Sequence, residues 1–210
     1  MTILMCLFAG FSIGLSGAMI PGPLLFYTLT KIMHGEKYVV VKVIGGHIIA
    51  EVVVVTLLIM GLSKVIASES IVSILSFSGG LVLFIMGFYT VISAKKMKFS
   101  DRKKVNFKSG GTLAGGLFFS VFNPGFPVWW ASVGTTGILN AMNIGVGALT
   151  AFILGHWLSD WGWFAVVGVS AQKGISLISD RTFQISIRIL GTLLALFGVY
   201  FVIRSGYLGL

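Results

Sequence analysis

Six stretches of the sequence are almost entirely apolar, and each is long enough to cross a bilayer as an α-helix. An α-helix needs roughly 20 consecutive apolar residues to span the hydrocarbon core. The stretches run approximately over residues 3–30, 39–63, 71–94, 111–138, 144–170 and 183–203. This pattern predicts an all-α membrane protein with six transmembrane helices.

The composition agrees with that prediction. Hydrophobic residues make up 56% of the chain and charged residues 10%, against roughly 25% charged residues in a soluble domain. The first apolar stretch has no basic region before it and is too long for a cleaved signal peptide, so we expect it to be a membrane span. Cys6 is the single cysteine, which excludes an intramolecular disulfide and a multi-cysteine metal site.

Basic residues are concentrated in the connections on one side of the predicted helices. The chain has 15 Lys and Arg against 6 Asp and Glu, and KKMKFSDRKKVNFK, from Lys95 to Lys108, holds seven of the basic residues. Short cytoplasmic loops carry the excess of Lys and Arg. We therefore expect a multi-pass plasma membrane protein with a cytoplasmic basic linker and both termini outside. A nucleic-acid partner is not expected, since these charges are explained as topology signals.

The two halves of the sequence resemble each other. GHIIAE at residues 46–51 and GHWLSD at residues 155–160 share the glycine, the histidine and an acid four residues later. GLVLFIMGFYTVI from Gly80 and GTLLALFGVYFVI from Gly191 are identical at six of thirteen positions. Because three helices form each unit, the second copy would cross the membrane in the opposite sense, as in many transporters. We predict two inverted three-helix repeats, residues 1–94 and 111–210, joined by the basic cytoplasmic linker at residues 95–110.

Two of the predicted helices contain proline-glycine breaks. Proline inside a helix removes a backbone donor and clashes with the preceding turn, and unpaired backbone at membrane depth is tolerated only where protein or a water-filled cavity satisfies it. A half-helix N-terminus also offers N–H groups to a carboxylate. The breaks therefore predict a substrate site, although kinks that serve packing alone are the structural alternative. The predicted binding residues are Pro21, Gly22, Pro23, Asn123, Pro124 and Gly125.

Each GHxxx[ED] motif places a histidine and an acid on one helix face, since residues four apart are neighbours. An acid at mid-bilayer costs about 2.5 to 3.5 kcal/mol, so it should face the protein interior and have a partner. We predict that His47, Glu51, His156 and Asp160 couple protons to transport. Glu51 and Asp160 are also expected to bind the substrate ammonium. Two alternatives stay open: hydrogen bonds that only hold the helices together, and a divalent-cation site built from the same four side chains.

The sequence has no GxxxxGK[ST] nucleotide-binding motif, so transport would draw on an ion or substrate gradient. An intramembrane enzyme is the competing class, because His–acid pairs can also transfer protons in hydrolysis. We expect no catalytic residue and no cofactor, since no HExxH metalloprotease motif accompanies the pairs.

Taken together, these features resemble the lysine-exporter (LysE/RhtB-type) family. The likeness rests on six predicted helices in 210 residues, the PGP break, the basic linker and the NPxxP break followed by aromatic residues. It implies a secondary carrier that exports amino acids from the cytoplasm by proton antiport, with the lipid bilayer, the amino acid and protons as partners. The resemblance extends to Pro21, Gly22, Pro23, Asn123 and Pro124. Divalent-cation export on the same scaffold stays open, because the wider superfamily implied by the resemblance includes metal carriers. Whether the chain forms a homo-oligomer also stays open.

Overall fold

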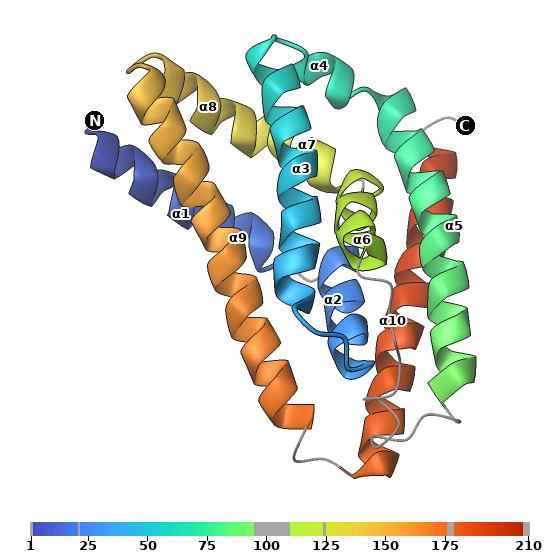
Figure 1. The fold of residues 1–210 in the computed structure, drawn as a ribbon. Coiled ribbons are helices and arrows are strands. Elements are labelled where there is room, and N and C mark those ends of the chain that lie inside the picture. The colour runs from blue at the N-terminus through green and yellow to red at the C-terminus, as the bar shows by residue number, and fades with distance from the viewer. Residues whose placement is uncertain (1, 21, 95–109, 124, 176–178, 208–210) are drawn as a thin grey trace.

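The computed structural model describes residues 2–20, 22–94, 110–123, 125–175 and 179–207. Within these ranges the secondary structure is helical and contains no strand, so the predicted all-α fold is confirmed (Figure 1). The start of the first helix and the end of the last helix lie at the same end of the molecule (Figure 1).

The first half of the chain contains a broken helix followed by two long helices. α1 (Ile3–Ala18) and α2 (Pro23–Met33) meet at an angle of 75°. Pro23 occupies the first turn of α2, where its missing N–H has no helical partner to lose. α3 (Val39–Ile59), the short α4 (Ser63–Ile66) and α5 (Glu69–Ala94) follow. The break falls where the proline-glycine segment predicts it, while Pro21 itself lies outside the described residues.

The second half begins with a more fragmented helix. α6 (Gly110–Val121) ends before the break, and α7 (Gly125–Trp129), the π-helical turn η2 (Trp130–Gly134) and α8 (Thr135–Met142) continue after it. Asn123 stabilises the start of α7, because its Oδ1 accepts a hydrogen bond from the Gly125 amide at 3.1 Å. α9 (Val146–Ile175) and α10 (Asp180–Tyr207) complete the fold. Pro124 lies outside the described residues.

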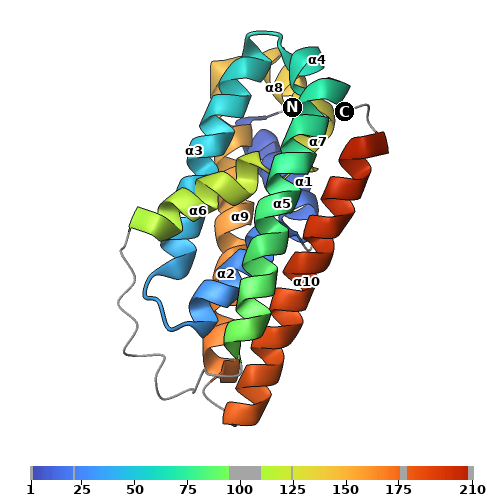
Figure 2. The same ribbon diagram turned by 90° about the vertical axis from the view of Figure 1, so that its right-hand side faces the viewer.

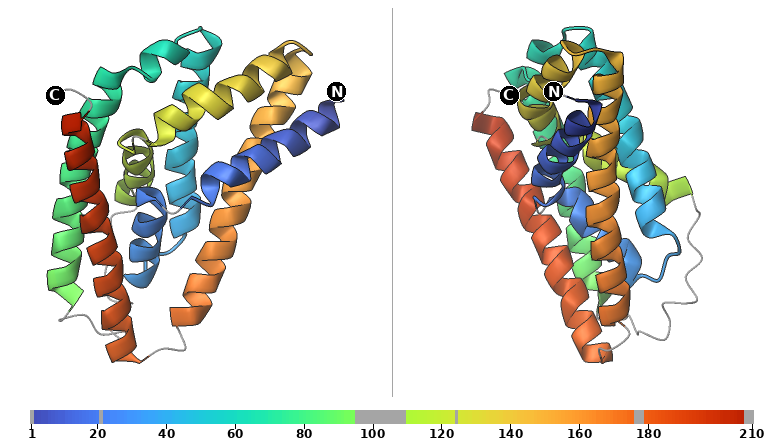
Figure 3. Two further views of the ribbon diagram at one scale, coloured as in Figure 1. Left: turned by 180° about the vertical axis from the view of Figure 1, so that it is seen from behind. Right: turned by 90° about the vertical axis from the view of Figure 1, so that its left-hand side faces the viewer.

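Two of the closest helix contacts join opposite halves of the chain through glycines. α1 crosses α9, where a Cβ added at Gly10 or at Gly155 would meet backbone atoms of the other helix (Figure 3). α3 packs against α6 in the same way at Gly46 and Gly116. Small residues let membrane helices approach this closely. In each pair, a helix with a GHxxx[ED] motif contacts the first part of the broken helix from the other half.

α5 and α10 form the third close pair and lie side by side, antiparallel, along one side of the molecule (Figure 2). Gly80 faces Gly198, and Gly87 faces Gly191, with no room for a Cβ at any of the four positions. The buried apolar side chains form two clusters. One joins α2, α5 and α10, and the other joins α1, α8 and α9.

Long apolar helices support a multi-pass membrane protein. Among the described residues, α3, α5 and α10 are long and apolar enough to cross a membrane, and the bent pair of α1 and α2 would form a fourth span. α9 has 30 residues but is not among them, because His156 and Asp160 interrupt its apolar sequence. Large apolar side chains on the outer surface, such as Ile85 and Phe88 at 58% and 57% exposure, suit contact with lipid. The number of six spans stays a prediction.

Candidate functional site

The two GHxxx[ED] motifs meet in one buried cluster between α3 and α9. His156 Nε2 lies 2.7 Å from Glu51 Oε1, and His47 Nε2 lies 3.2 Å from the same oxygen. Asp160 Oδ2 is 3.4 Å from His156 Nε2 and 4.0 Å from His47 Nε2. Glu51 is 1% exposed, and Asp160 is 3% exposed. The structure therefore joins all four predicted residues, and its shortest contact links a histidine of one half to an acid of the other.

His47 is held in place by a hydroxyl group that sequence reasoning missed. Ser120 on α6 donates its only proton to the Gly116 carbonyl oxygen at 2.7 Å. The 2.7 Å contact between Ser120 Oγ and His47 Nδ1 therefore requires an N–H donor on the histidine. His47 Nδ1 therefore carries a proton, and Nε2 is directed at the two acids. In the sequence, the only indication of this contact is that Ser120 comes three residues before the helix break at Asn123.

His156 has a different environment from His47. Its Nδ1 is buried and has no hydrogen-bond partner among the described residues. Gly14 of α1 lies beside this nitrogen, and a Cβ added there would come within 2.6 Å of it. The rings of Trp129 and Trp130 pack on the imidazole with centroid distances of 5.1 and 4.7 Å. We assign the His156 proton to Nε2, from which it donates to Glu51.

Both acids have an oxygen atom that no hydrogen bond satisfies. Glu51 Oε2 and Asp160 Oδ2 are buried without a hydrogen-bond partner among the described residues. Buried polar atoms in native proteins are nearly always hydrogen-bonded, so such atoms need an explanation. At a membrane-embedded site, a proton, a cation or a substrate ammonium would supply the missing partner.

Three of these side chains also have the arrangement of a cation site. One ligand atom each from His47, Glu51 and Asp160 can be chosen so that all three lie within 4.8 Å of one another. Imidazole and carboxylate groups suit divalent ions such as Mn²⁺ and Zn²⁺. The donor set therefore fits a divalent cation as well as an ammonium group.

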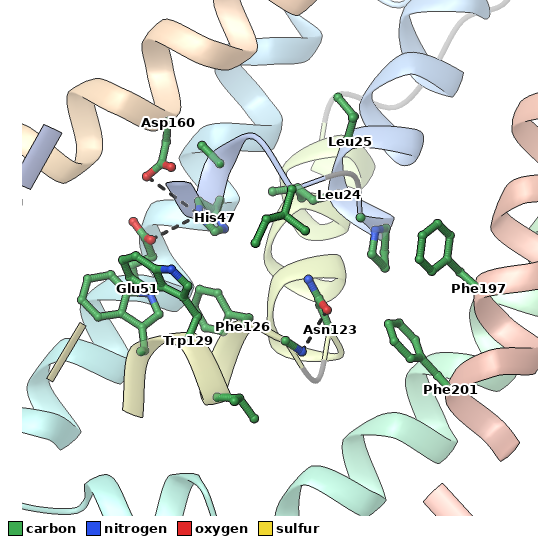
Figure 4. A pocket seen from close by; sticks show the side chains of 18 of the residues that line it. Leu24, Leu25, His47, Glu51, Asn123, Phe126, Trp129, Asp160, Phe197 and Phe201 are labelled. Carbon is green, nitrogen blue, oxygen red and sulfur yellow. Dashed lines mark hydrogen bonds and ion pairs between the residues drawn. The ribbon is translucent and has the colours of Figure 1, made fainter. Parts of the chain in front are cut away.

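A cavity of about 390 Å³ connects this cluster with the helix breaks and with α10. Small-molecule sites typically measure roughly 300 to 1,000 Å³. Figure 4 shows Asp160, Glu51 and His47 on one side of this space, and Phe197 and Phe201 of α10 on the other. Leu24 and Asn123 lie between the two groups (Figure 4).

The predicted residues at both breaks line the cavity where the structure describes them. Gly22 and Pro23 lie at the start of α2, and Asn123 and Gly125 lie at the start of α7. The two helix starts differ, because the Gly125 amide is already bonded to the Asn123 side chain, whereas no side chain caps α2. The start of α2 therefore keeps its N–H groups for a ligand.

A second charged cluster lies where α2 ends and α3 and α6 begin. The Glu36 carboxylate, with a side chain only 3% exposed, is 3.0 Å from Lys42 Nζ and 3.7 Å from Lys31 Nζ. Thr112 Oγ1 donates to the same carboxylate at 2.6 Å. Glu36 thus links α2, α3 and α6 through Lys31, Lys42 and Thr112. We did not single it out from the sequence, where it is one acid in a short basic connection.

Comparison with known families gives one match. The family described as LysE type translocator matches residues 15–205, which include both helix breaks, both GHxxx[ED] motifs and the basic linker. This match confirms the resemblance found in the sequence. No curated protein and no solved structure was found to match the chain.

Proposed function

Because the chain belongs to the LysE type translocator family, we propose that it exports amino acids from the cytoplasm in exchange for protons. Members of this family are membrane transporters, and the long apolar helices agree with that role. The observation that supports an amino acid cargo is the cavity of about 390 Å³ beside the His–acid cluster. This volume suits a small organic molecule and far exceeds what a single cation needs.

The two ends of an amino acid have separate partners along this cavity. We propose that the carboxylate binds the free N–H groups at the start of α2, where Leu24 and Leu25 line the cavity. The ammonium would bind Glu51 Oε2 and Asp160 Oδ2, the two buried oxygens that lack a hydrogen bond among the described residues. The start of α7 is not needed for this arrangement, since Asn123 already caps it.

Proton coupling follows from the same two acids. An ammonium and a proton compete for a carboxylate, so each weakens the binding of the other. Protonation of Glu51 or Asp160 would remove the negative charge that holds the cargo and would release it. His47 and His156, both within 3.2 Å of Glu51 Oε1, would pass the proton to and from the acids.

We further infer that residues 1–94 and 111–210 are inverted repeats with three spans each. The glycine contacts support this inference, because the contact of α1 with α9 has a counterpart in the contact of α6 with α3. Gly116 faces Val43 as Gly10 faces Phe152, and the two partners occupy equivalent positions of α3 and α9. The contacts of His156 with Glu51 and of His47 with Asp160 correspond in the same way.

The concentration of basic residues in the linker supports an orientation with residues 95–110 in the cytoplasm. The test is labelling of single cysteines by a membrane-impermeant thiol reagent in intact cells, in a Cys6→Ser background. Ala67→Cys, between α4 and α5, should react from outside. Gln172→Cys, near the end of α9, should react only after the cells are opened. The reverse pattern would contradict the orientation.

The transport proposal is tested in proteoliposomes that contain a pH-sensitive dye. Pools of amino acids, and separately Mn²⁺, Cd²⁺ and Zn²⁺, are added while the internal pH is followed. We expect an amino acid pool to move protons, and expect Glu51→Gln and Asp160→Asn each to abolish this coupling. Glu69→Gln, an exposed acid in the first turn of α5, is the matched control and should behave like the unchanged protein. Full coupling in the double variant of Glu51 and Asp160 would refute the mechanism.

Divalent-cation export is the second candidate function. It is favoured by the grouping of ligand atoms from His47, Glu51 and Asp160 within 4.8 Å. A proton response to the metals alone in the same experiment would establish this candidate and overturn amino acid export.

A further inference from the structure

The part of the cavity farthest from the acids is aromatic. Phe197 and Phe201 of α10 line it, and Leu24 of α2 lies between these two rings and the acids. Phe197 and Phe201 are one helical turn apart, with ring centroids 6.1 Å from each other. Figure 4 shows both rings across the cavity from Asp160 and Glu51, beyond Leu24 and Asn123. If the acids hold one end of a cargo, a cargo side chain that reaches this region would move out of water and contact apolar surface.

The charges along the cavity are unevenly distributed. Among the described lining residues, both carboxylates belong to the His–acid cluster at one end. The remaining charged group is Arg204 in the last turn of α10, whose Nη1 donates to the Tyr200 hydroxyl at 2.9 Å. A lysine or arginine side chain in the aromatic region would find no carboxylate there and would be repelled by Arg204.

Resting on the amino acid export proposed above, we propose that the cargo is an amino acid with a large neutral apolar side chain, such as leucine, methionine or phenylalanine. Its ammonium binds Glu51 and Asp160, and its carboxylate binds the start of α2. Its side chain lies against Phe197 and Phe201. These two phenylalanines are then the residues that determine specificity.

The size of the preference follows from the apolar area that the side chain buries. Each buried methylene changes affinity about fourfold, and leucine has three more side-chain carbons than alanine. Incomplete burial reduces the effect, so leucine should be preferred over alanine by about tenfold to fiftyfold. Lysine has a similar length but a terminal charge, and it should be transported least well of the three.

The experiment measures proton-coupled transport of L-leucine, L-methionine, L-phenylalanine, L-alanine, L-lysine and L-glutamate, each alone, by the full-length protein in proteoliposomes. Phe197→Ala should lower the ratio of leucine to alanine transport about tenfold. Phe88→Ala is the matched control, because Phe88 lies on the lipid-facing surface of α5 with 57% exposure. Phe197→Leu, which keeps an apolar side chain of smaller volume, should shift the preference toward phenylalanine and serves as the second variant.

The outcomes separate this inference from the proposed function. A preference for lysine, or for glutamate through Arg204, would overturn the apolar cargo and leave amino acid export standing. An unchanged ratio of leucine to alanine in Phe197→Ala and an unchanged preference in Phe197→Leu would also overturn it. A response to Mn²⁺, Cd²⁺ or Zn²⁺ alone, or no response to any amino acid, would overturn both proposals.

Discussion

Replacement of Gly155 by alanine tests the contact between α1 and α9, which positions His156 and Asp160. A Cβ at residue 155 would lie 2.9 Å from the Leu7 carbonyl carbon and 2.9 Å from the Phe11 amide nitrogen, and closer still to the Leu7 carbonyl oxygen. These are backbone atoms of α1, so the helices themselves must separate to admit the methyl group. Overpacking of this kind costs about 1 to 3 kcal/mol.

Gly162→Ala is the matched control on the same helix. No atom lies within 4 Å of a Cβ added at Gly162, so the methyl group meets no neighbour. Alanine is preferred over glycine inside a helix by about 0.8 to 1 kcal/mol. Both substitutions add the same methyl group and gain the same helix preference, but Gly155→Ala should be less stable than Gly162→Ala because of the overpacking against α1. The difference between the two variants therefore measures the contact with α1.

The assay is thermal unfolding of the purified protein in detergent, followed by tryptophan fluorescence. A change of 1 kcal/mol shifts Tm by about 2 to 4 °C for a chain of this size. Gly162→Ala should therefore raise Tm by up to about 4 °C, and the Tm of Gly155→Ala should lie about 2 to 12 °C below that of Gly162→Ala. Equal Tm values for the two variants would refute the close packing of α1 on α9.

Two further substitutions test contacts that sequence reasoning missed. Ser120→Ala removes the acceptor for His47 Nδ1 and should destabilise the protein by about 1 to 3 kcal/mol. Ser76→Ala is the control, because Ser76 is buried and donates to the carbonyl one turn earlier but contacts no histidine. It should lower the stability clearly less than Ser120→Ala. Equal losses in Tm would argue against the role of Ser120. Glu36→Gln weakens the ion pair with Lys42 and should lower the free energy of unfolding by about 1 to 3 kcal/mol. Breaking a fully buried pair costs about 3 to 5 kcal/mol, and the loss here is smaller because the lysine is partly exposed. A variant with unchanged Tm would show that the Glu36 cluster contributes nothing to stability.

The sequence by itself determined the all-helical fold, the positions of both helix breaks and the face shared by each histidine and its acid. These features depend on contacts within a few residues along the chain. A proline affects the turn beside it, and residues four apart are neighbours on any α-helix. The family could be identified for the same reason, because its features are spaced along the sequence.

Only the tertiary structure decided which residues of different helices meet. The bond between His156 and Glu51 joins residues 105 positions apart, and the one between His47 and Ser120 joins residues 73 apart. In a membrane helix that is apolar on all sides, the hydrophobic pattern does not mark the buried face, so sequence reasoning could not assign Phe197 and Phe201 to the cavity. The two histidines have the same sequence motif, and their surroundings differ because packing places Ser120 beside His47 and Gly14, Trp129 and Trp130 beside His156.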